Sequence, residues 1–351
     1  MGNSRPETDQ SGAGTGGPRP PVLDPLPLGG GAKLRAMINE PGMILAPQAY
    51  SPEMAAIAED AGHKCVYVGG GGTMARLFMF DDWGLMNPSE MADIAGRTVA
   101  GVSIPVIADM DQGGETPLNT YLTVKEYIRR GVAGAHIEDT LNPKHMAINA
   151  AANRHTAPTN RVLSIDEMQV RVEAAVAARK SAGADFIIIA RTDVLENTQD
   201  SDNATREEAL AETIRRGNAY AEAGSDVFMP DDATLQQTIA VMDGIPIPVL
   251  NHGTSDRVKV SDFRKTKLKI CINLYEPPIL LGVMEAMMRY FYETEDNTYV
   301  GLNLPGRLKY VQRDHNIDQE DLRKLGLAWA AARDRMTAYA PDGKADKARI
   351  G

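Results

Sequence analysis

The sequence predicts an α/β protein of the (β/α)8, or TIM-type, barrel class, and two patterns favour it. Eight short runs rich in Val and Ile recur along the chain, and they are continuous rather than alternating, which is typical of parallel strands covered on both faces. Helical patterns lie between the runs. Eight such units in roughly 260 residues favour a barrel, with chemistry at its carboxyl-terminal rim, over the alternative of a doubly wound open sheet.

The predicted strands and helices alternate along the chain. The strands are expected at residues 43–47, 64–69, 105–111, 134–139, 185–193, 226–230, 247–252 and 268–274. Helices are predicted over 164–182 and 205–223, and Ser164 with Glu167 forms a capping box for the first. Glycine, whose left-handed conformation ends a helix, follows several helical patterns just before the next strand: Gly62, Gly131, Gly183 and Gly224.

The chain divides into three predicted regions. Residues 1–32 are rich in Gly, Pro and Ser, so we expect a disordered or loosely draped N-terminal arm. Residues 33–300 are expected to form the catalytic barrel, and its long segment 140–163, which has no clear periodicity, is predicted to be a lid loop. Residues 301–351 are expected to form a C-terminal helical extension.

The C-terminal part predicts association between subunits. An apolar, Met-rich helical pattern covers residues 279–292, and a second pattern over 318–339 has apolar residues at helical spacing. In a chain that already holds a full barrel, such a stripe favours packing against another subunit. We therefore expect a homo-oligomer, a dimer or a tetramer.

Composition excludes several classes of function. The 351 residues are 43% hydrophobic and carry a net charge of −10, which disfavours a nucleic-acid partner because phosphate binding needs clustered Lys and Arg. No apolar stretch is long enough to cross a membrane, and no apolar signal segment begins the chain. Cys65 and Cys271 both lie in apolar runs, which is typical of reduced, buried thiols. We expect a cytoplasmic protein.

Three acids at the ends of two neighbouring strands predict a metal site. Asp109 and Asp111 end the third predicted strand, and Glu138 ends the fourth. Carboxylates repel one another, so a cluster of them indicates a divalent cation, and oxygen ligands suit Mg²⁺, with Mn²⁺ as an alternative. The competing interpretation is a set of loop acids that cap the following helices. Either way, the acids would share one rim of the barrel.

Other rim residues suit a small anionic substrate. Four glycines, residues 69–72, follow the second strand, and their N–H groups could hold a carboxylate or phosphate, unless they form only a flexible turn. Arg191 ends the fifth strand, where a guanidinium suits a bidentate carboxylate; a structural ion pair with Asp193 or Glu138 is the alternative. His252 and Thr254 follow the seventh strand and could bind the far end of the substrate.

Proton transfer needs a further group at the rim or on the lid. Histidine titrates closest to neutral pH, which favours it for this task. The candidates, including the residues of the lid, are Tyr67, Lys144, His145, His155 and His252.

Five motifs follow one another in the chain: YVGGGG over 67–72, FDDWGL over 80–85, VIADMDQG over 106–113, HIED over 136–139 and IARTD over 189–193. In order and spacing they resemble the isocitrate lyase/phosphoenolpyruvate mutase superfamily, over about residues 33–300. The chain looks like its short 2-methylisocitrate lyase and oxaloacetate-acting branches.

The resemblance implies a (β/α)8 barrel that exchanges its last helix between subunits, commonly as a tetramer. It implies Mg²⁺ near Asp111, with three further acids acting largely through water: Asp82, Asp109 and Glu138. It also implies a cradle for the carboxylate of the substrate, made by Gly69, Gly70, Gly71 and Arg191.

The chain departs from the family pattern at several positions. The lyases carry a Lys-(Lys/Arg)-Cys-Gly-His motif on the mobile loop, with the cysteine as the expected proton donor, whereas residues 140–163 contain no cysteine. The Asn-Ser pair of the phosphonate-forming members is absent as well. Asp231 stands where a Glu is expected, His252 where an Asn is expected, and Gly69 where a Ser is common.

These observations predict a Mg²⁺-dependent lyase that breaks a C–C bond in a small 2-hydroxy or 2-oxo di- or tricarboxylate through an enolate. Its partner would be a small carboxylate. One alternative is P–C chemistry, as in a phosphonomutase or phosphonopyruvate hydrolase. A second alternative is a barrel that binds small anions, or serves as a scaffold, without turnover.

Overall fold

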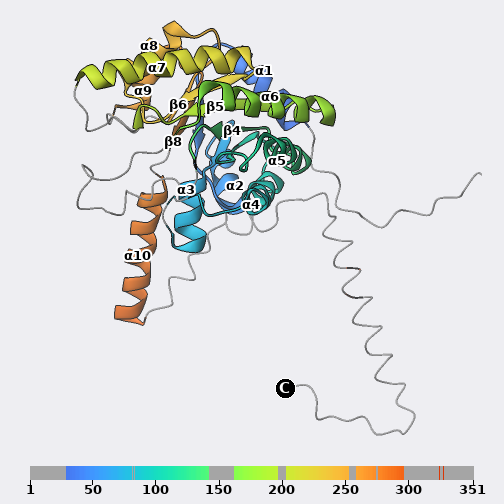
Figure 1. Cartoon of the computed structure of the whole chain (residues 1–351). Coiled ribbons are helices and arrows are strands. Elements are labelled where there is room, and N and C mark those ends of the chain that lie inside the picture. Colours follow the sequence, from blue (N-terminus) through green and yellow to red (C-terminus); the bar gives the residue numbers. More distant parts are fainter. Residues whose placement is uncertain are drawn as a thin grey trace, which may run out of the picture.

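The computed structural model describes residues 29–80, 82, 84–141, 162–196, 203–252, 258–273, 276–295, 324 and 327. Within them, eight parallel strands form the centre of the molecule (Figure 1). Each strand lies inside a range predicted for it. The strands are β1 Ile44–Pro47, β2 Val66–Val68, β3 Val106–Asp109, β4 Gly134–Glu138, β5 Ile187–Thr192, β6 Val227–Pro230, β7 Leu250–Asn251 and β8 Ile270–Asn273.

The order of strand pairing is that of a barrel. One sheet has the order β2-β3-β4-β5-β6, and a second has the order β1-β8-β7. Two isolated parallel bridges connect the sheets, from Gln48 to Tyr67 beside β1 and β2, and from Phe228 to Val249 beside β6 and β7. Each strand therefore follows its neighbour around a ring, and the predicted α/β barrel class is confirmed.

Helices alternate with the strands and cover their outer side (Figure 1). Their bounds are α1 Gly30–Asn39, α2 Pro52–Asp60, α3 Gly70–Thr73, the π-helical turn η1 Met74–Phe78, α4 Pro88–Ala100, α5 Pro117–Arg129, α6 Ile165–Ala182, α7 Asn203–Glu222, α8 Leu235–Gly244, α9 Val260–Phe263 and α10 Glu276–Thr294.

The predicted helix boundaries agree with the structure. Ser164 caps α6 through the N–H of Glu167, and the side chain of Glu167 accepts from the N–H of Ser164 in return. The glycines that follow α2, α5, α6 and α7 have positive φ angles, a conformation that side chains disfavour. These residues are Gly62, Gly131, Gly183 and Gly224.

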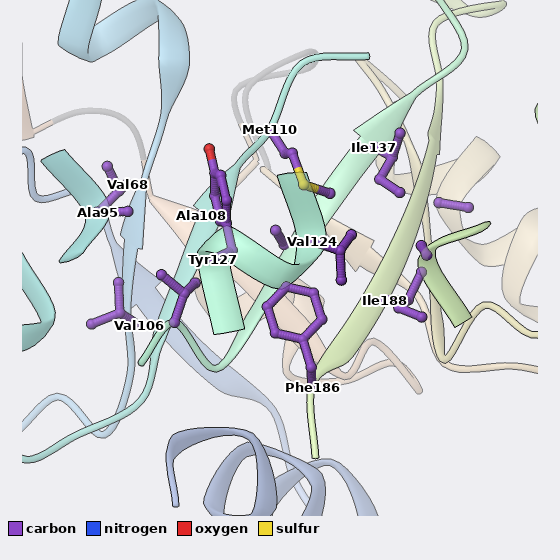
Figure 2. Packing of buried hydrophobic residues seen from close by; sticks show 14 of the residues in the cluster. Val68, Ala95, Val106, Ala108, Met110, Val124, Tyr127, Ile137, Phe186 and Ile188 are labelled. Carbon is purple, nitrogen blue, oxygen red and sulfur yellow. The ribbon is translucent and has the colours of Figure 1, made fainter. Parts of the chain in front are cut away.

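Apolar residues fill two layers, because both faces of each strand are buried. Along β2, Tyr67 points into the barrel, whereas Val66 and Val68 point outward to the helices. Figure 2 shows part of the outer layer, where Tyr127 of α5 and Phe186 pack around the strands. The continuous apolar runs of the sequence are explained by this double burial.

Helix α1 closes one end of the barrel interior. Its Leu34 is fully buried with inward residues of the strands. Arg35 forms ion pairs with Asp185 at 2.7 Å and Asp226 at 2.9 Å, both next to strand starts. The helix begins at Gly30, inside the range predicted for the arm; residues 1–28 lie outside the described residues.

The predicted lid and the C-terminal region are described only in part. Thr140 and Val162 pair as an antiparallel bridge, so the two ends of the long segment meet next to β4. Residues 142–161 lie outside the described residues, as do most of 301–351. Helix α10 extends away from the strands in Figure 1, and its described side chains over 282–294 are exposed. Among the described helices, none is long and apolar enough to cross a membrane.

Candidate active site

A cavity of about 260 Å³ lies at the carboxyl ends of the strands, where the chemistry of a barrel is expected. Its size suits a small organic acid rather than a nucleotide. Side chains from most of the strand ends reach it. The cavity is lined by Gln48, Tyr67, Gly69, Gly70, Gly71, Gly72, Asp82, Asp109, Arg191, Glu196, Met229, Asp231, His252 and Ile272.

Asp109, the last residue of β3, is held in place by main-chain donors. Its Oδ2 accepts from the N–H of Gly70 at 2.9 Å, and its Oδ1 accepts from the N–H of Asp111 at 2.9 Å. The hydroxyl of Tyr127 donates to the carbonyl oxygen of Asp109 at 2.7 Å. The carboxylate is buried and therefore fixed in direction.

His136 stands beside Asp109 on the neighbouring strand, with which it is in register. Its Nε2 lies 2.8 Å from the hydroxyl of Tyr67 and 3.6 Å from Oδ1 of Asp109. The rings of Tyr67 and His136 are stacked at 5.8 Å. A phenol, an imidazole and a carboxylate thus form one buried series, in which a proton can move between Tyr67 and His136.

Glu138 ends β4 and is fully buried. Its Oε1 accepts from Nε2 of Gln112 at 3.0 Å and from the hydroxyl of Thr140. Its Oε2 lies 3.4 Å from Nη1 of Arg191. Gln112 and Thr140 thereby orient Glu138, and Arg191 places a cation on its other side.

Asp109, His136 and Glu138 can hold a metal ion. Each offers one ligand atom, and these atoms lie within 4.8 Å of one another. Two buried carboxylates supply the hard oxygen donors that Mg²⁺ and Mn²⁺ prefer. The donor set therefore fits a divalent cation.

Asp111 contributes to the same corner through its main chain. Its N–H donates to Asp109, and its carbonyl oxygen accepts from the N–H of Glu138 at 3.0 Å. Its φ of 45° lies in the left-handed region, which is uncommon outside glycine. The turn that joins the two strand ends is thus held in a costly conformation, as often occurs at functional sites. Among the described residues, Asp111 is not in the set of three whose ligand atoms gather.

Arg191, at the end of β5, joins the acids on the far side of the cavity. Its Nε and Nη2 donate to the two oxygens of Asp193 at 2.7 and 2.9 Å, and Nη2 also donates to Asp231 at 3.0 Å. Burial alone would lower the pKa of Arg191, but the negative charges of Asp193, Asp231 and Glu138 raise it well above its usual value. The guanidinium is a permanent cation fixed in a buried position.

Asp231 and His252 form a second charged pair. Nε2 of His252 lies 3.0 Å from Oδ1 of Asp231. Burial opposes a charge on Asp231, yet Arg191 and His252 lower the pKa of Asp231 below its usual range. Burial likewise opposes a charge on His252, but Asp231 raises the pKa of His252 above its usual value. Asp231 therefore favours the cationic form of His252.

Glu196 is a cavity residue that sequence reasoning missed. It lies in the turn after β5, and its carboxylate is grouped with those of Asp193 and Asp231, with one oxygen of each within 4.8 Å of the others. Burial, and then the charge of Asp231, raises the pKa of Glu196 to about 8.

The glycine run lets polar side chains approach the main chain. A Cβ on Gly72 would lie 1.8 Å from Nε2 of Gln48, and one on Gly70 would lie 2.8 Å from Oδ2 of Asp109. A Cβ on Gly71 would lie 2.9 Å from Asp82. The N–H of Gly70 is directed at Asp109, so the predicted carboxylate cradle would use the other N–H groups.

A model of the phosphoenolpyruvate phosphomutase family matches residues 34–272, which is more than half of the chain and includes the cavity residues named above. The chain belongs to the phosphoenolpyruvate phosphomutase family. The superfamily predicted from the motifs is thereby confirmed.

Individual relatives of the chain are lyases or related enzymes. Isocitrate lyase of Haloferax volcanii is 35% identical over 199 residues, 57% of this chain and 52% of that one. 2-Methylisocitrate lyase of Aeropyrum pernix is 30% identical over 250 residues, 69% of this chain and 73% of that one. The chain thus spans about half the length of the first relative. A structure of oxaloacetate acetylhydrolase with the product oxalate has a TM-score of 0.69 at 27% identity, covering 87% of this chain and 99% of that one.

The remaining residues predicted for the site differ in where they lie. Asp82 lines the cavity. Asp139 does not face the cavity lining: its Oδ2 accepts from Arg216 and from the hydroxyl of Tyr220, both at 2.8 Å, which makes it a support for the outer helices. The predicted lid residues and one rim residue lie outside the described residues, namely Lys144, His145, His155 and Thr254.

Proposed function

We propose that this family member is a divalent-cation-dependent lyase that breaks a C–C bond of a small 2-hydroxy or 2-oxo di- or tricarboxylate, through an enolate. The observation that carries the proposal is the group formed by Asp109, His136 and Glu138, because Asp109 lines the small cavity together with Arg191. Such a site offers an electron sink on one side and an anion-binding cation on the other. The names of the relatives support the reaction class.

Asp109 and Glu138 would hold Mg²⁺ or Mn²⁺, while Nε2 of His136 faces the hydroxyl of Tyr67. The bound cation would stabilise the negative charge that develops when a bond next to a 2-oxo group breaks. The protein prepares for that charge by fixing the carboxylates beforehand: Asp109 through two N–H groups, and Glu138 through Gln112 and Thr140.

Arg191 and His252 would bind the carboxylates of the substrate. The bidentate contact with Asp193 orients the guanidinium and leaves Nη1 on the side of Glu138. Asp231 raises the pKa of His252 and so favours its cationic form, which suits anion binding more than removal of a proton. A substrate with two or more carboxylates matches these two cations.

Tyr67 would serve as the base where a substrate hydroxyl must lose its proton. Tyr67 lines the cavity, and its hydroxyl lies 2.8 Å from Nε2 of His136, which can accept the phenolic proton in the appropriate tautomer. Tyr67 would take the proton of the substrate hydroxyl while it passes its own proton to His136 along their hydrogen bond. Lys144 and His155 of the lid segment remain proposed contributors.

The exposed apolar side chains of α10 support a homo-oligomer, which we propose as a dimer or tetramer. Met288 and Tyr292 are 69% and 85% exposed, and apolar neighbours along the helix share this exposure. An apolar surface of this kind on one helix is typical of an interface. The buried free thiols of Cys65 and Cys271 support the cytoplasm as its location.

A substrate panel tests the proposal. Oxaloacetate, methylisocitrate, dimethylmalate and phosphonopyruvate are each incubated with the full chain plus Mg²⁺, and in parallel with a chelator. We expect C–C cleavage of at least one carboxylate with Mg²⁺, loss of cleavage with the chelator, and loss in Asp109→Asn but not in the exposed control Asp243→Asn.

Other results of the panel identify the alternatives. The matched family model bears the name of a phosphomutase, so release of inorganic phosphate from phosphonopyruvate alone would replace the proposal with P–C chemistry. Tight binding of the acids without turnover would favour a non-catalytic anion-binding barrel.

A further inference from the structure

One of the four acidic residues that line the cavity is Glu196, in the turn after β5. Glu196 lines the cavity together with Arg191, Asp231 and His252. It follows the end of β5. Any small acid bound in a cavity of about 260 Å³ would lie close to it.

The charges around Glu196 disfavour its ionised form. Asp193 and Asp231 already share the guanidinium of Arg191, and Asp231 also holds His252. Counting Glu138 and Glu196, four carboxylates face two cations among the described residues. Asp232, next to Asp231, adds further negative charge. Like charges at this spacing force one group to keep its proton.

Glu196 is the group best placed to keep it. Burial raises the pKa of Asp193 as well, whereas the positive charge of Arg191 lowers it. Asp193 accepts a bidentate contact from Arg191, and Asp231 accepts from Arg191 and pairs with His252, so both carboxylates have donors that favour their ionised forms. Burial and Asp231 raise the pKa of Glu196 to about 8, in agreement with this assignment. Asp193 and Asp231 are already paired with Arg191, which argues against a second metal ion bound by Asp193, Glu196 and Asp231.

We propose that Glu196 is the general acid of the reaction and delivers its proton to the carbon atom of the enolate left by C–C cleavage. The inference rests on the proposed function. It assigns to Glu196 the task that the family resemblance gives to a loop cysteine, which residues 140–163 lack.

The step balances in atoms and charge. When the C–C bond breaks, its electron pair stays with the fragment that becomes the enolate. The carbon of that enolate then forms a bond to hydrogen while the O–H bond of Glu196 breaks, which leaves a carboxylate. This carboxylate lies among those of Asp193 and Asp231, so their repulsion favours recovery of a proton from water before the next turnover.

The test compares Glu196→Gln with wild type and with Glu173→Gln, an exposed glutamate of α6. Glutamine keeps the size of the side chain and a hydrogen-bond donor but has no acidic proton. On the acid that wild type cleaves, we expect kcat of Glu196→Gln to fall about 10²- to 10⁴-fold with little change in KM. The affinity for oxalate, a product-like dianion, should stay near that of wild type.

Two further readouts separate proton delivery from a structural role. Wild-type kcat should fall as the pH rises above about 8, and the decline should be absent from the residual activity of Glu196→Gln. Infrared difference spectra of the two chains should show a protonated carboxyl band at neutral pH that disappears above that pH.

Three results would overturn the inference: wild-type kcat in Glu196→Gln, a parallel loss of kcat and oxalate affinity, or no protonated carboxyl band. A wild-type chain that cleaves none of the panel acids would remove the proposed function, and with it the delivery step. The infrared band would still decide separately whether Glu196 holds a proton.

Discussion

Arg191 is the residue on which the charge balance of the site depends. It is buried and contacts Glu138, Asp193 and Asp231, which belong to three different strand ends. Without the positive charge of Arg191, these buried carboxylates would repel one another and lack a compensating cation. Its contribution to stability therefore exceeds that of the ion pairs on the surface.

Arg191→Gln should lower the free energy of unfolding by about 3–5 kcal/mol, because it leaves buried carboxylates without their cation. Arg97→Gln is the matched control, since Arg97 pairs with Asp93 on the surface of α4, where such a pair contributes about 0–1 kcal/mol. Urea unfolding measures both variants. Equal losses would contradict the assigned role of Arg191.

Glu196 should make stability dependent on pH. Its pKa is about 8 in the folded chain against an ordinary 4.5, so the unfolded chain releases this proton at lower pH. Stability should therefore fall as the pH rises from about 4.5 to about 8. The raised pKa of His252 acts in the same direction, because its contribution is lost as the pH rises through that pKa. Urea unfolding across this range should give a flatter profile for Glu196→Gln, and an unchanged profile would contradict the assignment.

Part of the site is predictable from sequence. Asp109, Glu138 and Arg191 each stand at the end of an apolar strand, and parallel strand ends meet at one rim. His136 is two residues before Glu138, so the strand period of two places both on the same face. This spacing is the sequence signal that indicates His136 as a site residue. The position of Glu196 depends on a turn beyond β5, and no local pattern indicates how such a turn folds back to the cavity.

At the scale of elements, α1 illustrates close packing through glycine. A Cβ on Gly31 would lie 1.7 Å from the carbonyl oxygen of Asp185, next to the start of β5. A Cβ on Gly29, at the N-cap of the same helix, meets nothing within 4 Å. The helix can approach the strands only because position 31 has no side chain.

Gly31→Ala should therefore destabilise the barrel by about 1–3 kcal/mol through overpacking, since the carbonyl oxygen belongs to the main chain and has little freedom to move. Gly29→Ala is the control and should leave the thermal midpoint within a degree or two of wild type. A similar midpoint for the two variants would show that α1 is not packed as described.

Sequence patterns predict the strands better than the helices. All eight strands lie inside the predicted ranges because their apolar runs reflect burial on both faces. Helix α1 starts within the predicted arm, since its opening glycines are typical of disorder and their packing role appears only in the folded chain. Ser164 and Glu167 mark the start of α6 correctly because capping is a local interaction.

At the scale of the whole molecule, α10 carries the surface through which we expect subunits to associate. Its apolar side chains are exposed in a single chain, and the free energy of covering them would favour association. Met288→Glu should therefore shift the molar mass measured by light scattering towards the monomer, because it places a charge on that surface. Glu285→Gln, on the same helix, is the control. A monomeric wild type, or an unchanged mass for Met288→Glu, would contradict the proposed oligomer.

Titration calorimetry of Mg²⁺ and Mn²⁺ into the full chain tests the central claim most directly. If the buried acids at the ends of β3 and β4 hold a divalent cation, wild type and Asp243→Asn should bind one ion per chain, while Asp109→Asn should bind at least tenfold more weakly (about 1.4 kcal/mol or more). Equal binding by Asp109→Asn and wild type, or no binding by wild type, would contradict the account.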